Sequence, residues 1–194
     1  MTRLWLIRHG EPSEESRRRC YGSLDVGLSP IGREQMASVA ETLAAESFAA
    51  IYTSPRTRAV ESARIVATGR GITTVPEFRE IDFGDFEGLT YDEIALRYPD
   101  LYRQWMEHPT EIQFPNGESF AAMQSRVLDA FSRICSAHAN ETVAIVSHGG
   151  VNRIVIAWAL QMPNECLFRL AQGHAALNLV TITEGVPALE LLNS

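Results

Sequence analysis

The sequence contains no lysine, and all 17 of its basic residues are arginines. This absence excludes catalysis that depends on a lysine, such as Schiff-base formation, and the lysine-bearing phosphate loop of many nucleotide-binding proteins. Arginine, in contrast, can bind a phosphate or a carboxylate through two parallel hydrogen bonds. A biased genomic composition would also remove lysine, so the absence by itself identifies no function.

Cysteine pairs, metal-ligand patterns and long apolar runs are also missing from the sequence. Cys20, Cys135 and Cys166 are widely separated, so we expect free thiols in a reducing compartment. The five histidines lack the spacing of known zinc motifs, and we expect neither a metal nor another cofactor. The longest apolar stretch, residues 154–160, is too short to span a membrane, and residues 4–7 are too short for a signal peptide. We therefore expect a cytoplasmic protein.

Length and charge narrow the choice further. The 194 residues, 45% of them hydrophobic, are enough to bury a core, and we expect a single domain over residues 1–194. The net charge of −7 gives no general attraction to nucleic acid or to an anionic membrane. We therefore expect a small-molecule ligand and a monomer or homodimer.

Short apolar segments alternate with helical patterns along the chain. The expected strands are residues 4–7, 49–53, 73–75, 142–147 and, as the last one, 176–183. The expected helices run from Ser29-Pro30 to about Glu46, from Ser54-Pro55 past Val66, from residues 116–118 past Ile134, and over residues 151–160. One or two short helices are expected within residues 91–114. This alternation predicts a layered α/β domain with a mainly parallel sheet.

Two of the expected strands end in the same way, in Arg8-His9-Gly10 and in Ser147-His148-Gly149. Ligands of such sheets bind at the carboxyl ends of the strands. If the two strands are neighbours, His9 and His148 face one small volume. The two glycines allow a ligand to approach the backbone, and the helix that follows offers free N–H groups to an anion.

This combination of residues suits phosphoryl transfer. A neutral imidazole is a good nucleophile near pH 7, and its attack on phosphorus gives a phosphohistidine. Arginines and a second histidine would neutralise the charge on the phosphoryl oxygens, and an acid would protonate the leaving alkoxide. The residues alone leave open whether Arg56 or Arg58 joins the site. They also do not choose the acid among Glu80, Asp82, Asp85 and Glu87.

The segments "LIRHGE", "TSPRTRA", "FREIDFGDFEG" and "VSHGGV", in this order, resemble the histidine phosphatase superfamily, also called phosphoglycerate mutase-like. The resemblance runs from Leu4 to about Asn178. It implies a three-layer αβα sandwich and an enzyme that hydrolyses phosphoric monoesters.

The resemblance also implies roles for individual residues. His9 corresponds to the phosphorylated nucleophile and Glu80 to the proton donor. Arg8, Arg58, His148 and Gly149 correspond to the phosphate-binding residues, with His148 also counted as catalytic. Arg56 is expected to be structural or peripheral, and Tyr21 and Gly22 are candidates for the substrate side of the pocket.

Two departures favour a phosphatase over a cofactor-dependent phosphoglycerate-type mutase. The mutases carry further arginines after the acid region, but residues 88–115 hold only Arg97 and Arg103. After "RHGE" this sequence has Pro12-Ser13, where the mutases usually have a small hydroxyl residue and, soon after, an asparagine. The stretch "RRRCYGSLDVGLSPIGREQ" resembles the α-ribazole-phosphate phosphatases of cobalamin assembly, whereas "FPNGESF" and "GHAALNLV" are shared with broad-specificity members. We therefore expect a phosphomonoesterase for a small phosphorylated metabolite, with α-ribazole phosphate as a candidate. A non-catalytic phosphate-binding module is the alternative of another class.

Other residues carry weaker expectations. Of Arg17, Arg18 and Arg19, at most one is expected to contact substrate. His108, His138 and His174 are interpreted as structural, with His174 the one nearest the pocket, and Tyr98, Tyr102 and Trp105 as part of a core or lid.

Overall fold

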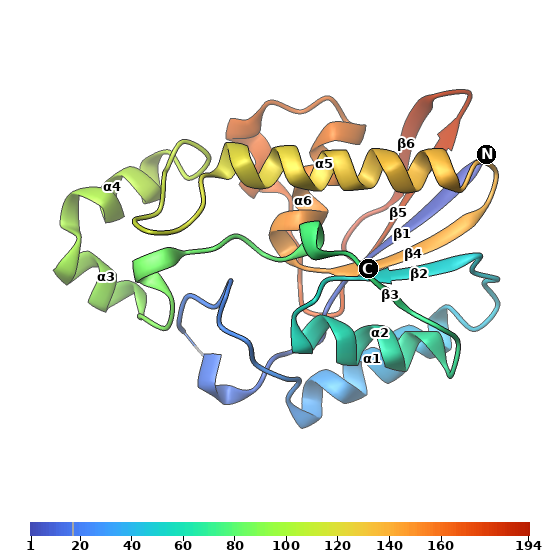
Figure 1. Cartoon of the computed structure of the whole chain (residues 1–194), viewed down its shortest axis with the longest axis horizontal. Coiled ribbons are helices and arrows are strands. Elements are labelled where there is room, and N and C mark those ends of the chain that lie inside the picture. Colours follow the sequence, from blue (N-terminus) through green and yellow to red (C-terminus); the bar gives the residue numbers. More distant parts are fainter. Residues whose placement is uncertain (17) are drawn as a thin grey trace.

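The computed structural model describes residues 1–16 and 18–194. In this part of the chain, six strands form one sheet in the order β3-β2-β4-β1-β5-β6 (Figure 1). The strands are β1 (Thr2–Arg8), β2 (Ala50–Thr53), β3 (Thr73–Thr74), β4 (Thr142–Ser147), β5 (Leu177–Thr183) and β6 (Val186–Leu191). The first four pair in parallel, while β5 and β6 are antiparallel to their neighbours. The expected α/β architecture with a mainly parallel sheet is confirmed.

The central strands β1 and β4 are neighbours because both are apolar on both faces. Their register pairs Arg8 with Ser147, and the His9 N–H donates to the Ser147 carbonyl at 3.0 Å. His9 and His148, the next residues along the two strands, therefore emerge side by side at one edge of the sheet.

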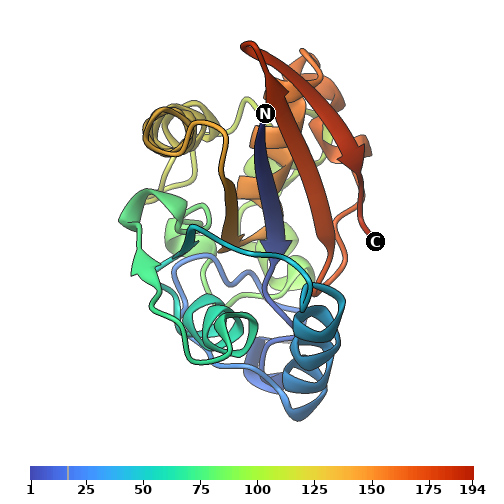
Figure 2. The ribbon, with the colours of Figure 1, turned by 90° about the vertical axis from the view of Figure 1, so that its right-hand side faces the viewer.

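Helices cover both faces of the sheet (Figure 2). Leu4 and Leu6 of β1 pack in one core with α5 (Phe120–Ala137) and α6 (Gly149–Ala159). Trp5 and Ile7 point the other way, into a core with α1 (Pro30–Thr42) and α2 (Thr57–Ala67). The alternation of β1 side chains thus builds the expected three-layer αβα sandwich.

A smaller helical extension lies beyond the carboxyl ends of the strands, at the left of Figure 1. It contains α3 (Tyr91–Arg97) and α4 (Pro99–Glu107), two short helices as expected. Trp105, Phe86 and Phe114 form its own apolar cluster, against which Tyr98 and Tyr102 pack. Short 3₁₀ helices connect the elements: η1 (Glu14–Ser16), η2 (Pro76–Phe78), η3 (Gly84–Phe86) and η4 (Asn164–Arg169).

Three expected boundaries were wrong. The helix after Ser29 ends at Thr42 instead of Glu46, although Ser29 does cap it by accepting the Gly32 N–H. The second helix begins at Thr57, and Arg56 replaces Ser54 as its N-cap. The long helix begins at Phe120 with Ser119 as its cap, because Asn116 has a φ of +53° and lies in a turn before it.

The C-terminal strand was missed. Residues 176–183 are not the last strand, because β6 pairs with β5 through a turn at Glu184 and Gly185, both with positive φ. A separate finding concerns membranes: no helix in the described residues is both long enough and apolar enough to cross a bilayer.

Candidate active site

The ends of two strands and the start of one helix bring the predicted residues together. His9 follows β1, His148 follows β4, and their ring centroids are 5.2 Å apart. Arg58 comes from the first turn of α2, and like both histidines it is buried. Gly10 is required here because a Cβ at this position would lie 2.3 Å from the Gly32 carbonyl oxygen.

The hydrogen bonds of His9 define its tautomer. Its Nδ1 lies 2.7 Å from the Gly10 carbonyl oxygen, which can only accept, so we assign the proton to Nδ1 and the free lone pair to Nε2. Burial lowers the pKa of His9 well below 6.5, and the charges of Arg58 and Arg8 lower it further. His9 is therefore neutral at pH 7, the form that can act as a nucleophile.

His148 is held by Ser54. Its Nε2 lies 2.7 Å from Ser54 Oγ, which also accepts the Arg56 N–H at 3.3 Å. We assign the Ser54 hydroxyl as donor to Nε2, which leaves the His148 proton on Nδ1. Burial lowers the pKa of His148 well below 6.5, with Arg58 as the next contribution. Ser54, expected to cap a helix, orients a histidine instead.

Arg58 holds the neighbouring loop as well as facing the site. Its Nη1 donates to the Leu24 carbonyl at 3.0 Å, and its Nη2 donates to the Tyr21 and Gly22 carbonyls at 3.0 and 3.1 Å. Burial lowers its pKa, while the Glu80 carboxylate opposes that effect. Gly22 is needed for packing, since a Cβ there would lie 1.7 Å from the Ile81 carbonyl oxygen.

Several donors in this region have no partner. Among the described residues, Arg8 Nε, Arg58 Nε and His148 Nδ1 are buried without a hydrogen bond, as are Arg56 Nε and Trp5 Nε1. A buried donor without a partner typically costs about 1–3 kcal/mol. The first three belong to Arg8 and Arg58, which line the same cavity as His9, and to His148, whose ring lies 5.2 Å from that of His9.

The structure shows which of the four acids left as candidates by the sequence lies in the cavity with His9. Glu80 lines the cavity with His9, and its carboxylate accepts the Gly150 and Ile81 N–H groups. Glu87 instead accepts four loop N–H groups, those of Gly22, Ser23, Leu24 and Phe83. Asp82 accepts the Gly84 N–H and Asp85 bonds the Asn116 amide. Among these acids only Glu80 lines the cavity that contains His9.

The cavity that contains His9 has a volume of about 210 Å³. The predicted residues that line it are Arg8, His9, Tyr21, Arg58 and Glu80. Gly149 lies beside it, because a Cβ there would be 3.5 Å from Arg8 Nε. Arg19 also lines the cavity, Arg18 does not, and Arg17 lies outside the described residues.

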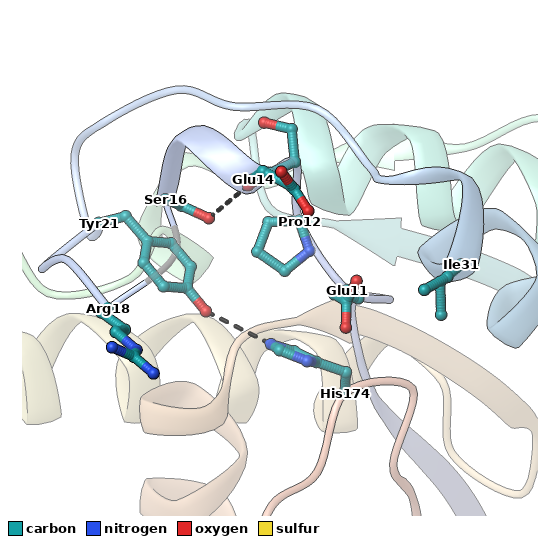
Figure 3. Close-up of a pocket in the computed structure, with 9 residues that line it drawn as sticks. Glu11, Pro12, Glu14, Ser16, Arg18, Tyr21, Ile31 and His174 are labelled. Carbon is teal, nitrogen blue, oxygen red and sulfur yellow. Dashed lines mark hydrogen bonds between the residues drawn. The ribbon is translucent and has the colours of Figure 1, made fainter.

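A second cavity of about 340 Å³ also has Tyr21 in its lining (Figure 3). The Tyr21 hydroxyl and His174 Nε2 form a hydrogen bond of 3.4 Å, and both residues line this cavity, together with Glu11 and Arg18. His174 lies near the pocket, as expected, because its ring lies 5.8 Å from that of His9, and its interpretation as structural stays a prediction. Burial and the charge of Arg8 lower its pKa to about 4.

Sequence reasoning missed Arg153. It lines the cavity from α6, and its Nε donates to the Leu170 carbonyl at 2.9 Å. Burial lowers its pKa, and the Glu80 carboxylate opposes that effect. The available signal was a lone arginine inside "VNRIVIAWAL", an otherwise apolar helix.

Known proteins are similar to this chain over much of its length. The chain is 34% identical over 196 residues to a bifunctional protein of Mycobacterium tuberculosis, Rv2228c, matching 99% of this chain and 54% of the relative. It is 35% identical over 150 residues to phosphoserine phosphatase 1 of Hydrogenobacter thermophilus, which covers 76% of this chain and 71% of that protein. The chain thus spans about half the length of the first of these relatives.

A solved structure is similar over nearly the whole chain. The α-ribazole phosphatase of Shigella flexneri superposes with a TM-score of 0.91 at 30% identity, covering 99% of this chain and 96% of that one. Residues 4–194 match the family described as the histidine phosphatase superfamily, branch 1. The predicted relationship is confirmed: the chain belongs to the histidine phosphatase superfamily.

Proposed function

We propose that the protein is a phosphomonoesterase that hydrolyses a small phosphorylated metabolite through a phosphohistidine on His9. One observation carries the proposal. A neutral His9, with its lone pair on Nε2, lines a cavity together with Arg8 and Arg58, and within the described part of the chain Arg8 Nε, Arg58 Nε and the neighbouring His148 Nδ1 are buried without partners. Such donors match the oxygens of a phosphoryl group.

In the first step, phosphoryl oxygens accept hydrogen bonds from these three donors. The His9 Nε2 lone pair forms a bond to phosphorus, and the bond from phosphorus to the alcohol oxygen breaks. Glu80, in its protonated form, gives its proton to that oxygen, so the alcohol leaves neutral. Its position in the same cavity as His9 supports this role.

In the second step, water attacks the phosphohistidine. The Glu80 carboxylate takes a proton from the water as its oxygen bonds to phosphorus, and the bond from phosphorus to Nε2 breaks. The products are inorganic phosphate and neutral His9, with Glu80 protonated for the next turnover. Ser54 and the Gly10 carbonyl are positioning groups that keep the two imidazoles in the required tautomers.

Within the phosphatases, we propose α-ribazole phosphate as the first substrate to test. The support is the likeness to the Shigella flexneri enzyme over 99% of this chain. The relative named phosphoserine phosphatase makes phosphoserine the competing substrate. A mutase is less well supported, because Arg97 and Arg103 are exposed and do not line the cavity that contains His9.

The test is phosphate release from both esters, 3-phosphoglycerate, sugar phosphates and nucleotides, without added metal. The His9→Ala variant should lose release, whereas His108→Ala, a change at an exposed histidine, should keep it. Isomerisation of 3-phosphoglycerate without release would establish the mutase. Binding of phosphate esters with neither release nor isomerisation would establish the non-catalytic module.

A further inference from the structure

A third cavity, of about 170 Å³, adjoins the one that contains His9. The two share Glu80, Phe83, Tyr91 and Arg153 in their linings. The neighbouring cavity has a different character, because most of its other lining residues are apolar or aromatic. A ligand held at His9 could therefore extend into an apolar space without leaving the site.

Aromatic rings from the helical extension form one wall of this apolar cavity. Tyr91 stacks on Trp105 at 5.4 Å and an interplanar angle of 17°, and Phe83 lies 5.7 Å from Trp105. A second wall comes from α6 and η4, where the Arg153 guanidinium lies 5.5 Å from the centre of the Phe168 ring. Two walls of planar groups suit a planar guest, because stacked and edge-on ring contacts add to the gain from burial.

The direction of the reaction places the alcohol on this side. In-line attack by His9 puts the leaving oxygen opposite Nε2, within reach of the proton donor. Glu80, the proposed donor, lines the apolar cavity and not the larger cavity that His174 lines. The alcohol part of the substrate therefore extends into the apolar cavity, which Glu80 lines, and not into the cavity drawn in Figure 3, which Glu80 does not line.

Charge distinguishes between possible alcohols. Among the described residues that line the apolar cavity, Glu80 is the only acid and Arg153 the only base. Glu80 is committed to proton transfer and to the Gly150 N–H. An ammonium group on the alcohol would thus meet a guanidinium and aromatic edges with no carboxylate of its own, which disfavours alcohols that carry an ammonium group.

We infer, on the basis of the proposed function, that the substrate is a phosphomonoester whose alcohol carries an aromatic ring system, held between the Tyr91–Trp105 wall and the Arg153–Phe168 wall. The α-ribazole candidate belongs to this class. Phosphoserine and simple sugar phosphates do not.

The experiment compares three esters of primary alcohols: 3-phenylpropyl phosphate, propyl phosphate and O-phospho-L-serine. The phenylpropyl and propyl leaving groups have matched acidity, so their difference reports the ring. We expect kcat/KM for the phenylpropyl ester to exceed that of the propyl ester by about 10- to 100-fold, as burial of one ring predicts. Phosphoserine should be the poorest of the three.

A variant pair locates the preference. Phe168 is half exposed, so Phe168→Ser removes a wall without opening the main core, and the phenylpropyl-to-propyl ratio should fall several-fold. Val186→Ser, an exposed apolar change on β6, should leave the ratio unaltered.

The outcomes separate this inference from the proposed function. Release from all three esters at similar efficiency, abolished by His9→Ala, would overturn the aromatic preference and leave the phosphatase intact. A preference for phosphoserine would do the same. No release from any ester would overturn both, and a ratio untouched by Phe168→Ser would remove the assigned wall.

Discussion

The surroundings of His138 and the pocket around His9 and His148 contain similar residue types. They differ in how many of the histidine ring nitrogens form hydrogen bonds. At the end of α5, His138 has a partner on each ring nitrogen: Glu141 at 2.6 Å on Nδ1 and the Tyr52 hydroxyl at 2.8 Å on Nε2. In the pocket, His9 and His148 each have one ring nitrogen in a hydrogen bond, whereas the other ring nitrogen has no partner among the residues that the structure describes. A histidine whose two ring nitrogens both form hydrogen bonds within the protein has a structural role. Buried donors and acceptors without a protein partner can instead form hydrogen bonds to a ligand.

The largest expected effect comes from comparing an alanine substitution at His9 with one at His138. His9→Ala should lower kcat/KM by about 10³-fold or more, because the covalent route disappears. His138→Ala should leave kcat unaltered and lower the free energy of unfolding by about 1–3 kcal/mol, because Tyr52 and Glu141 lose their hydrogen bonds to His138. Steady-state kinetics and urea unfolding measure the two. A His138→Ala enzyme that is folded and inactive would break the comparison.

Glu80→Gln should have the next largest effect, and the effect should depend on the leaving group. Alkyl phosphates need a proton on the leaving oxygen, so their turnover should fall by about 10²- to 10³-fold. Nitrophenolate leaves without a proton, so 4-nitrophenyl phosphate should still phosphorylate His9 and then stall, because water is no longer deprotonated.

Rapid-quench measurement should show this stall as a burst of nearly one nitrophenolate per enzyme. Asp85→Asn, an exposed change in the same segment, is the control and should leave both rates as they are. Equal losses for both ester types, without a burst, would assign Glu80 a role in binding rather than in proton transfer.

Ser54→Ala should lower kcat by about 10-fold, since His148 would no longer be held with its proton on Nδ1. We also expect the acid limb of the kcat–pH profile to shift, which a loss of packing alone would not produce. Ser136→Ala removes an exposed hydroxyl that donates to the Ser132 carbonyl, and it serves as the matched control. A lower melting temperature with an unmoved pH profile would contradict the positioning role.

The smallest effect concerns stability against pH. In the folded protein the pKa values of His9, His148 and His174 lie below 6.5, that of His174 at about 4. As the pH falls below 6.5, these histidines therefore bind protons in the unfolded chain while they are still neutral in the folded one. Their stabilising contribution is complete above pH 6.5 and is lost as the pH falls from 6.5 toward the folded values.

The slope expected for each fully buried histidine is roughly 1 kcal/mol per pH unit. Melting temperatures between pH 7.5 and 5 measure it, and His9→Asn should flatten the curve relative to wild type. His108→Asn, at an exposed site, should not. An unchanged slope in His9→Asn would show that this imidazole gains its proton as easily folded as unfolded.

The sequence was informative where local pattern and tertiary role coincide. Runs such as residues 142–147 predicted β4, and two strands ending in histidine-glycine predicted the paired imidazoles. Ser29-Pro30 predicted a helix cap correctly. The same pattern at Ser54-Pro55 failed, because Ser54 bonds a histidine 94 residues away, and no local rule contains that partner.

The rest depended on distant contacts. Glu80 is preferred to Glu87 as the proton donor because the Glu87 carboxylate accepts the loop N–H groups of residues 22–24. The sequence does not show that these residues lie close together. Arg153 enters the site only because α6 begins at Gly149, directly after His148. Strand β6 has alternating half-buried positions and lies at the sheet edge, where the pattern is weakest.

The unpartnered donors around His9 have a thermodynamic consequence. A pocket that keeps three buried N–H groups unmatched gives up stability in its empty form, which is the usual trade between stability and activity. Inorganic phosphate, the product of the proposed reaction, fits the same donors and so returns that stability on binding. At a concentration 100 times its dissociation constant, it would add about 2.7 kcal/mol. Product inhibition and thermal protection are therefore one equilibrium, and a melting curve would measure both.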